Sequence, residues 1–120
     1  MFEKKTPIYL QLIDEFKQQI VTKAWPPGSY IASVRELALS YQVNPNTVLK
    51  ALTELEEEGL LVNERTVGKK VSVDIHLIDQ ARRDMLEQYI KQFIDLGQGI
   101  GYQSSELVEI LHQWKGDKHD

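Results

Sequence analysis

Residues Pro27–Val71 decide the fold, and they read PGSYIASVRELALSYQVNPNTVLKALTELEEEGLLVNERTVGKKV. Ser33 and Glu36 form a capping-box pattern, in which the hydroxyl and the carboxylate each accept a backbone N–H, so a helix is expected to begin there. Asn44, which stands before a proline, predicts a second helix start, because Asn caps well and Pro is tolerated at the first helical position. Gly59 predicts the end of that second helix as a left-handed cap.

The end of this stretch predicts a small antiparallel hairpin. Apolar and polar residues alternate over 70–74, opposite a first strand over 61–65, and the turn between them contains Gly68. Tyr30 and Ile31 predict a short edge strand. The order helix, turn, helix and hairpin is that of a winged helix-turn-helix, a fold that places its second helix in a groove of DNA.

Helical periodicity frames this stretch on both sides. Thr6 is expected to cap a first amphipathic helix, which ends near Ala24. In the C-terminal part, a helical apolar pattern is broken at Gly97 and the glycines behind it, and Ser104 is expected to cap a last helix. We predict a mainly α fold with a small β-hairpin, with a winged helix-turn-helix domain over 1–74 and a two-helix C-terminal dimerisation segment over 75–120.

Composition narrows the functions available to this chain. Its 120 residues include no cysteine, which excludes disulfides and thiolate metal sites. No stretch is long and apolar enough to span a bilayer, and the N-terminus lacks the apolar core of a signal peptide, so we expect a cytoplasmic protein without membrane contact. His76, His112 and His119 lack ligand spacing, and no catalytic set has a frame. We therefore expect no metal, no cofactor and no enzymatic activity.

The net charge of −4 does not exclude DNA binding, because recognition depends on a local basic face. Residues 1–74 carry nine Lys or Arg against ten Asp or Glu, and residues 75–120 carry five against eight. The C-terminal part is thus the acidic one, and we expect it to face away from phosphate.

The helix that begins at Asn44 carries the chemistry of a recognition helix. Asn46, Thr47, Leu49 and Lys50 are expected to be exposed near its start. Asn pairs bidentately with adenine, Thr hydrogen-bonds or touches the thymine methyl, and Lys reaches guanine or phosphate. Free N–H groups and the helix dipole at the N-terminus also suit phosphate. The alternative is an ordinary capped amphipathic helix, since Asn and Thr are common at helix starts.

Basic residues elsewhere predict further phosphate contacts. Arg35 follows the first helix cap, and Lys69 and Lys70 follow Gly68, which permits close approach of the backbone. The alternatives are a surface ion pair for the arginine and a solvated, charge-protected hairpin for the lysines. The complete set predicted to bind DNA is Lys5, Arg35, Asn44, Asn46, Thr47, Leu49, Lys50, Arg65, Gly68, Lys69 and Lys70.

Five motifs together resemble the GntR family of bacterial transcription factors. They are PIYLQ at 7–11, PG at 27–28, SVRELA at 33–38, VNPNTV at 43–48 and ELE with GL at 54–60. The short helical remainder resembles the YtrA subfamily in length and pattern. The resemblance implies a winged helix that binds a palindromic operator as a homodimer, which we expect to be a repressor, and points to a transporter operon as its target. It also implies that Arg35, Asn46, Thr47 and the residues after Val48 meet DNA.

The sequence departs from the family pattern in the wing. The family reads R-G-x-G-T-aromatic-V, whereas this chain reads RTVGKKV at 65–71. The missing first glycine and the missing aromatic residue predict a changed wing geometry, and the added lysines favour a grip on phosphate over base reading. Leu49 stands where the family often has a basic or small residue. A leucine cannot hydrogen-bond to a base, so the contact expected of it is with a thymine methyl.

The two C-terminal helices predict a dimer interface. Two helices over 46 residues (120 − 74) cannot enclose a ligand pocket within one chain, yet their apolar rows need cover, which a second copy provides. The alternative is that they fold back on the winged domain, and a small-molecule effector at the interface stays open. The predicted interface residues are Ile78, Met85, Leu86, Tyr89, Ile90, Phe93, Leu107, Ile110, Leu111 and Trp114.

Two functions compete at this point. The first is a homodimeric transcription regulator that binds double-stranded DNA. The second is a protein-interaction module that uses the winged fold as a scaffold, which the net acidity allows. Replacement of Asn46 and Lys50 by Ala separates them, because only the first function depends on these side chains.

Overall fold

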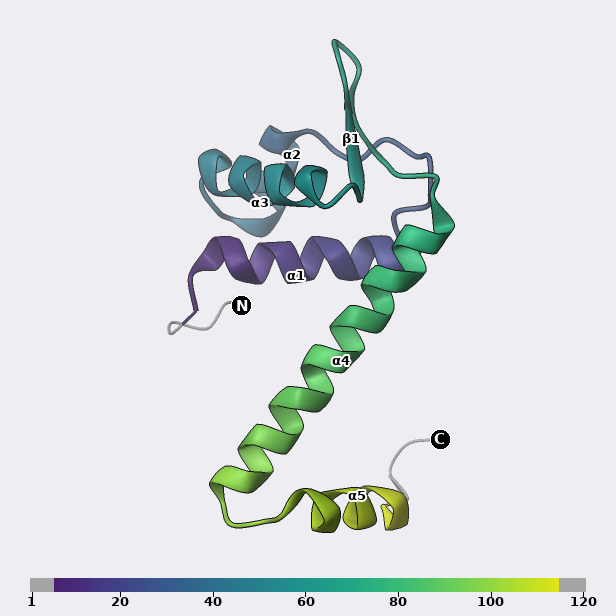
Figure 1. The fold of residues 1–120 in the computed structure, drawn as a ribbon. Helices are drawn as coiled ribbons and strands as arrows, with labels where there is room; N and C mark the ends of the chain where they lie inside the picture. The colour runs from purple at the N-terminus through teal and green to yellow at the C-terminus, as the bar shows by residue number, and fades with distance from the viewer. Residues whose placement is uncertain (1–5, 115–120) are drawn as a thin grey trace. The chain divides into compact units, whose positions relative to one another are not determined.

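A computed structural model describes residues 6–114 of the chain (Figure 1). It divides into two compact units, one up to Arg82 and one from Arg83 onward. The elements in chain order are α1 (Ile8–Val21), α2 (Val34–Tyr41), α3 (Pro45–Glu57), β1 (Leu61–Glu64), β2 (Gly68–Val71), α4 (Ile75–Gly99) and α5 (Ser104–Gln113). The predicted fold class, mainly α with a hairpin behind the helix-turn-helix, is confirmed.

Helix α1 buries its apolar stripe but starts and ends differently from the prediction. Pro7 occupies the N-cap position in an extended conformation, and no side chain among the described residues caps the helix. The prediction of Thr6 as the cap is therefore wrong by one residue. The helix ends at Val21, earlier than the predicted end near Ala24. The stripe itself is fully buried at Leu12, Phe16 and Ile20.

Helices α2 and α3 begin at the two predicted caps. The Ser33 hydroxyl accepts the Glu36 N–H at 3.1 Å, and the Glu36 carboxylate accepts the Ser33 N–H at 2.9 Å. The Asn44 side chain accepts the Asn46 N–H at 2.7 Å. These short-range bonds satisfy backbone donors that the helices themselves leave open. The predicted left-handed residue after α3 is also confirmed, with φ of 82° at Gly59.

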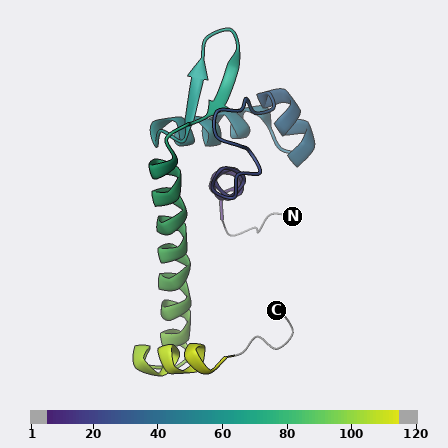
Figure 2. The same ribbon diagram turned by 90° about the vertical axis from the view of Figure 1, so that its right-hand side faces the viewer.

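The hairpin is tighter than predicted. Strands β1 and β2 pair antiparallel with Glu64 opposite Gly68, so the loop contains only residues 65–67 (Figure 2). Within this loop Thr66 takes a left-handed conformation, with φ of 65°. The predicted edge strand is reduced to a single bridge between Tyr30 and Lys70. Thr66 stands where the family has its first glycine, and it adopts a conformation of the kind that glycine takes readily.

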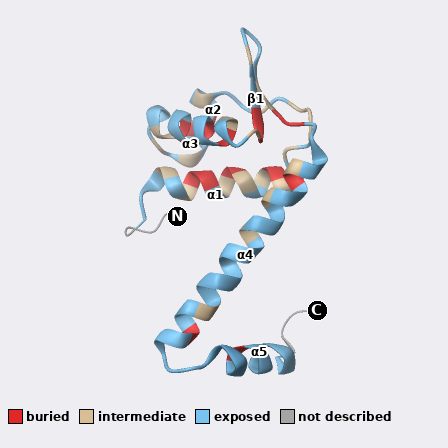
Figure 3. Ribbon diagram, in the orientation of Figure 1, coloured by how far each residue is buried: buried red, intermediate tan, exposed pale blue. Residues whose placement is uncertain are grey.

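One hydrophobic core holds the first unit together, and the buried segments in Figure 3 gather on α1, α3 and the base of the hairpin. Helices α1 and α3 contribute equally to this core, and Ile78 from the start of α4 is also fully buried in it. The compact unit therefore extends beyond the predicted domain end at residue 74. Asp74 fixes the start of α4, since its carboxylate accepts the N–H groups of His76 and Leu77 at 3.1 and 3.2 Å.

In the second unit, α4 runs past Gly97 and ends at Gly99, within the glycine segment predicted to break it. Gly97 lies inside the helix and is buried, and a Cβ built there would meet both Cδ atoms of Leu107 at 2.6 Å. The glycine is thus a packing position, where α5 approaches α4 closely. The prediction of Ser104 as the cap of α5 is wrong by one residue. Gln103 is the N-cap residue, and its N–H donates to the Glu106 carboxylate at 2.8 Å.

Candidate nucleic-acid interface

The core side of α3 decides which of its residues face outward. Its side chains at Val48, Ala51, Leu52 and Leu55 are fully buried. The opposite face is accessible, with Asn46, Lys50 and Thr53 exposed and Thr47 partly buried. Leu49 is 44% exposed, which makes it an apolar contact surface on an otherwise polar face. The side chains predicted to recognise DNA therefore lie on the accessible face of α3.

The first turn of α3 does not offer the free N–H groups that the sequence suggested. Pro45 has no N–H, the Asn46 N–H is taken by the Asn44 side chain, and the Thr47 N–H donates to the Asn44 carbonyl at 2.9 Å. Phosphate capture by open amides at this helix start is a wrong prediction, because the cap has already satisfied these groups. In this region side chains, and not open amides, are the groups accessible to a nucleic acid, and Asn44 acts within the chain as a cap.

A second helix end lies close by in the sequence and carries a free cation. Arg35 is exposed in the first turn of α2, and no carboxylate between residues 6 and 114 pairs with it. Glu36 beside it is committed to the cap. Its bond with the Ser33 backbone N–H, and then that with the Ser33 hydroxyl, lowers the pKa of this carboxyl. Arg35 therefore has the exposure and the uncompensated charge that a phosphate contact needs.

Lys50 is held in a defined place by a residue that the sequence did not point to. Its ammonium lies 3.8 Å from the centre of the Tyr9 ring on α1. A cation over an aromatic face is attracted by a ring that carries no net charge, so its own charge is not compensated as it would be in an ion pair. Lys50 thus remains a positive group on the exposed side of α3, oriented by α1.

The two wing lysines have carboxylate partners. Lys69 pairs with Glu56 of α3, and Lys70 pairs with Glu64 at 2.8 Å. Tyr30 donates its hydroxyl hydrogen to the same Glu64 carboxylate. These bonds lower the pKa of Glu64, with Lys70 as the first cause, and raise that of Lys70. Neither lysine presents the uncompensated charge that the predicted grip on phosphate assumed.

The tip of the wing carries the remaining predicted contacts in this unit. Arg65, Thr66 and Val67 form the loop and are exposed, and Val67 is 62% accessible. Gly68 has open space above it, since nothing lies within 4 Å of a Cβ built there. Lys5 lies outside the described residues. Arg65 is thus the exposed cation at the tip.

The predicted dimer residues fall into two groups. Ile78 is fully buried in the core of the first unit, and it has no surface to offer a second chain, so its assignment to an interface is wrong. Leu107 is 4% exposed, packed against Gly97. Met85 is partly exposed, and the exposed members are Leu86, Tyr89, Ile90, Phe93, Ile110, Leu111 and Trp114.

The exposed group surrounds an apolar groove within the second unit. The groove measures about 220 Å³. It is lined by Tyr89, Ile90, Phe93, Ile94, Leu107, Val108 and Leu111. Exposed apolar surface of this kind marks an interaction site more often than a plain solvent face.

Neither a metal centre nor a membrane helix occurs in the described part of the chain. No three His, Asp or Glu side chains within residues 6–114 gather closely enough to hold a metal ion, and His119 lies outside this range. None of the helices in the same range combines the length and apolar character that crossing a bilayer requires.

Comparison with known proteins agrees with this geometry. The family described as "Bacterial regulatory proteins, gntR family" matches residues 8–71. The chain is 36% identical to the HTH-type transcriptional repressor YtrA of Bacillus subtilis over 110 residues, which cover 91% of this chain and 82% of that protein.

Solved structures extend the likeness to the whole fold. A GntR family transcriptional regulator from Listeria monocytogenes superposes with a TM-score of 0.84 at 31% identity, over 95% of this chain and all of the other. The DNA-binding domain of AraR in complex with operator ORX1 superposes with a TM-score of 0.57 at 26% identity, over 60% of this chain and 93% of that one. The chain belongs to the GntR family of DNA-binding transcriptional regulators and resembles its YtrA-type members.

Proposed function

We propose that the chain acts as a homodimeric repressor on a palindromic operator. The observation that carries this proposal is the exposed apolar surface of the second unit, where Leu86, Tyr89, Ile90 and Phe93 of α4 are each 41–49% accessible. Across a two-fold axis the same residues of a second copy would cover them, because an isologous interface presents one patch to itself. Two recognition helices would then meet two half-sites about one helical turn apart or a multiple of it.

The size of the groove favours a protein chain over a small molecule as its occupant. At about 220 Å³ it lies below the roughly 300–1,000 Å³ usual for ligand pockets. It is also open along a helix pair, which suits an apolar side chain of a partner helix. The dimer test below also addresses a small-molecule effector. If the groove binds such a ligand instead of a second copy, the chain stays monomeric and an added apolar ligand raises its stability.

A charge placed in the apolar surface tests the dimer. We expect the wild-type chain to sediment with the mass of two copies, and Phe93→Asp to shift it to one copy, because an aspartate cannot be buried there without a partner. Gln92→Asp on the neighbouring exposed position is the control and keeps the dimer. A wild-type chain that is monomeric at every concentration tested contradicts the proposal.

Selection of bound duplexes from random DNA tests the operator. Palindromic half-sites with a fixed spacing support the dimeric mode, and a single unrepeated motif refutes it. Asn46→Ala and Lys50→Ala are expected to weaken binding by about 1–3 kcal/mol each if they contact base edges, whereas Lys91→Ala on α4 should have no effect. Binding without preference over scrambled DNA at physiological salt rejects sequence-specific regulation and favours the scaffold function.

Repression by occlusion needs only that the dimer covers a promoter. The similarity to a repressor named YtrA supports this sign of regulation. The resemblance makes transporter operons the first targets to examine. A reporter fused to the selected operator should rise when the gene is deleted, and a fall in expression refutes the repressor assignment.

A further inference from the structure

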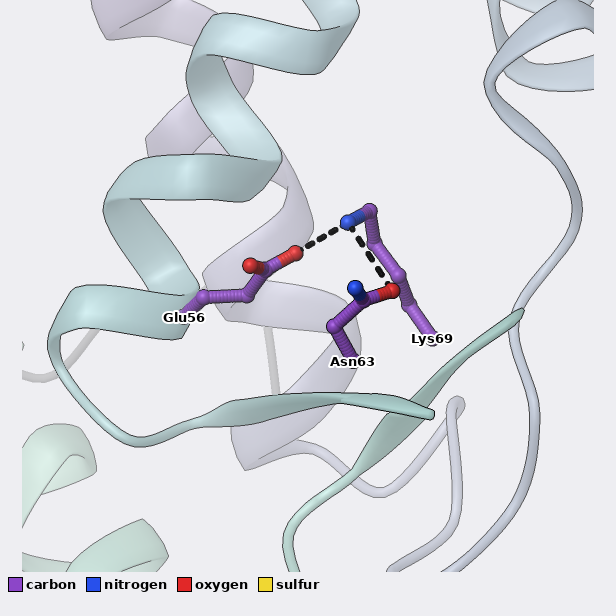
Figure 4. A network of polar contacts seen from close by, with 3 residues as sticks. All are labelled: Glu56, Asn63 and Lys69. Carbon is purple, nitrogen blue, oxygen red and sulfur yellow. Dashed lines mark hydrogen bonds and ion pairs between the residues drawn. The ribbon is translucent and has the colours of Figure 1, made fainter. Parts of the chain in front are cut away.

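Lys69 connects three segments of the winged unit. Its ammonium lies between the Glu56 carboxylate of α3 and the Asn63 side-chain oxygen of β1, the latter at 3.4 Å (Figure 4). Asn63 is also its partner across the hairpin. The Lys69 carbonyl accepts the Ile31 N–H at 2.9 Å. One residue thus joins the recognition helix, both strands of the wing and the segment that leads into α2.

The pair with Glu56 is partly shielded from water. The side chains of Lys69 and Glu56 are 16% and 23% exposed. An ion pair at such a site is screened less by salt than one on the open surface. It also holds the strands below the loop of the hairpin, where a small rotation of the strands moves the loop tip by a larger distance.

The direct alternative is that Lys69 contacts phosphate. A lysine that contacts phosphate releases a counterion and steepens the salt dependence of binding. Lys69 would have to leave Glu56 to do so, and Glu56 would then remain as an unpaired negative charge on the recognition helix. That charge would repel DNA, so the unpaired Glu56 would cancel part of the affinity gained from a contact between Lys69 and phosphate.

We propose that Glu56 and Lys69 are positioning residues, which fix the wing against the recognition helix, and that Arg65 makes the phosphate contact of the wing. Arg65 lies in the exposed loop, and no carboxylate among residues 6–114 forms an ion pair with it. The pair sets where the tip lies relative to α3, and Arg65 then uses that position.

The decisive variant is Glu56→Gln, because the two mechanisms predict opposite signs. A positioning pair that is broken leaves the wing mobile, so the affinity for a duplex selected with the wild-type full chain should fall by about 3–10-fold, a loss in the lower part of the range expected for coupled neighbours. If Lys69 instead contacts phosphate, removal of a competing carboxylate tightens binding. Glu57→Gln is the matched control, since it removes an exposed acid from the same helix end, and it should not weaken binding.

A charge swap and a salt titration complete the test. Glu56→Lys combined with Lys69→Glu rebuilds the pair, so it should restore most of the affinity that either single variant loses. Lys69→Gln should leave the slope of log K against log salt unchanged, whereas Arg65→Gln should reduce its magnitude by about 0.9 for each phosphate that the arginine no longer neutralises. A slope that falls with Lys69→Gln, or a swap that binds worse than both singles, overturns the proposal.

A readout without DNA separates positioning from any change in the groups that touch phosphate. Amide hydrogen exchange over 61–71 should be faster in Glu56→Gln than in the wild-type chain and return toward wild-type rates in the charge swap. Unchanged exchange in Glu56→Gln, with the far-ultraviolet spectrum intact, shows that the pair does not hold the wing and refutes the assignment.

Discussion

Gly97 is the position where a single methyl group should have the clearest local effect. A Cβ there would lie 2.6 Å from both Cδ atoms of Leu107 and 3.1 Å from its Cγ. Rotation about the Cβ–Cγ bond of Leu107 would move only the two Cδ atoms. Because Cγ is also close, that rotation alone does not relieve the contact. Overpacking of this kind costs about 1–3 kcal/mol. Alanine recovers up to about 1 kcal/mol of helix propensity, so Gly97→Ala should be neutral to destabilising by about 2 kcal/mol.

Gly99 supplies the matched control two residues further along the same helix. Nothing lies within 4 Å of a Cβ built there, so Gly99→Ala should keep the gain in propensity without the clash. The two variants should thus differ by about 1–3 kcal/mol in the local opening of α5, which is about 5–150-fold in amide protection.

Hydrogen exchange followed by mass spectrometry over α5 in the full chain measures this difference. Faster exchange in Gly97→Ala than in Gly99→Ala is the expected result. Leu107→Ala added to Gly97→Ala should cost less than the sum of the two single changes, because the clash disappears with the leucine side chain. Equal protection of α5 in the two alanine variants would refute the packing argument.

Three further changes address the first unit. Ser33→Ala should lower the free energy of unfolding by about 1 kcal/mol in urea denaturation, while Ser33→Asp, which also caps, should largely retain it. Thr66→Gly should slow amide exchange in the wing, because a side chain in the left-handed region costs about 1–2 kcal/mol. The greater flexibility of glycine in the unfolded chain offsets about 0.5–1 kcal/mol of this gain in stability. Val67→Gly is the control and should give no such gain. Burial, aided by the Glu15 carboxylate, raises the pKa of Tyr41 to about 12, so the neutral phenol stabilises the fold fully below pH about 10 and this contribution is lost between about 10 and 12. Phenolate absorbance should show this late step, Tyr41→Phe should remove it, and its persistence in that variant would exclude the assignment.

Local interactions account for the parts of the fold that the sequence predicted well. The caps at Ser33 and Asn44 bond to groups two or three residues away, so their signals are complete within a short window of sequence. The core face of α3 follows from helical periodicity in the same way. The caps predicted at Thr6 and Ser104 are each one residue away from the observed N-cap. Helix boundaries are uncertain by a residue or two, because neighbouring positions at a helix start have similar backbone geometry.

Longer-range contacts explain what the sequence did not predict. Glu56 and Lys69 are 13 residues apart, and their pairing depends on the register of a hairpin whose loop was predicted one residue too long. The contact of Lys50 with Tyr9 requires the packing of α1 against α3. Sequence alone therefore indicated where the basic residues stand, but not which of them are shielded or already compensated by a carboxylate.

Ile78 also limits how this protein can be recombined with others. The region shared with the family ends at residue 71, yet the buried core of the first unit is completed by this isoleucine, one turn into α4. A foreign C-terminal segment grafted directly after the wing would leave a cavity, and loss of a large buried side chain costs about 2–5 kcal/mol. A workable chimera must either keep the native chain through Arg82 or bring a branched apolar residue at the equivalent place in its own first helix.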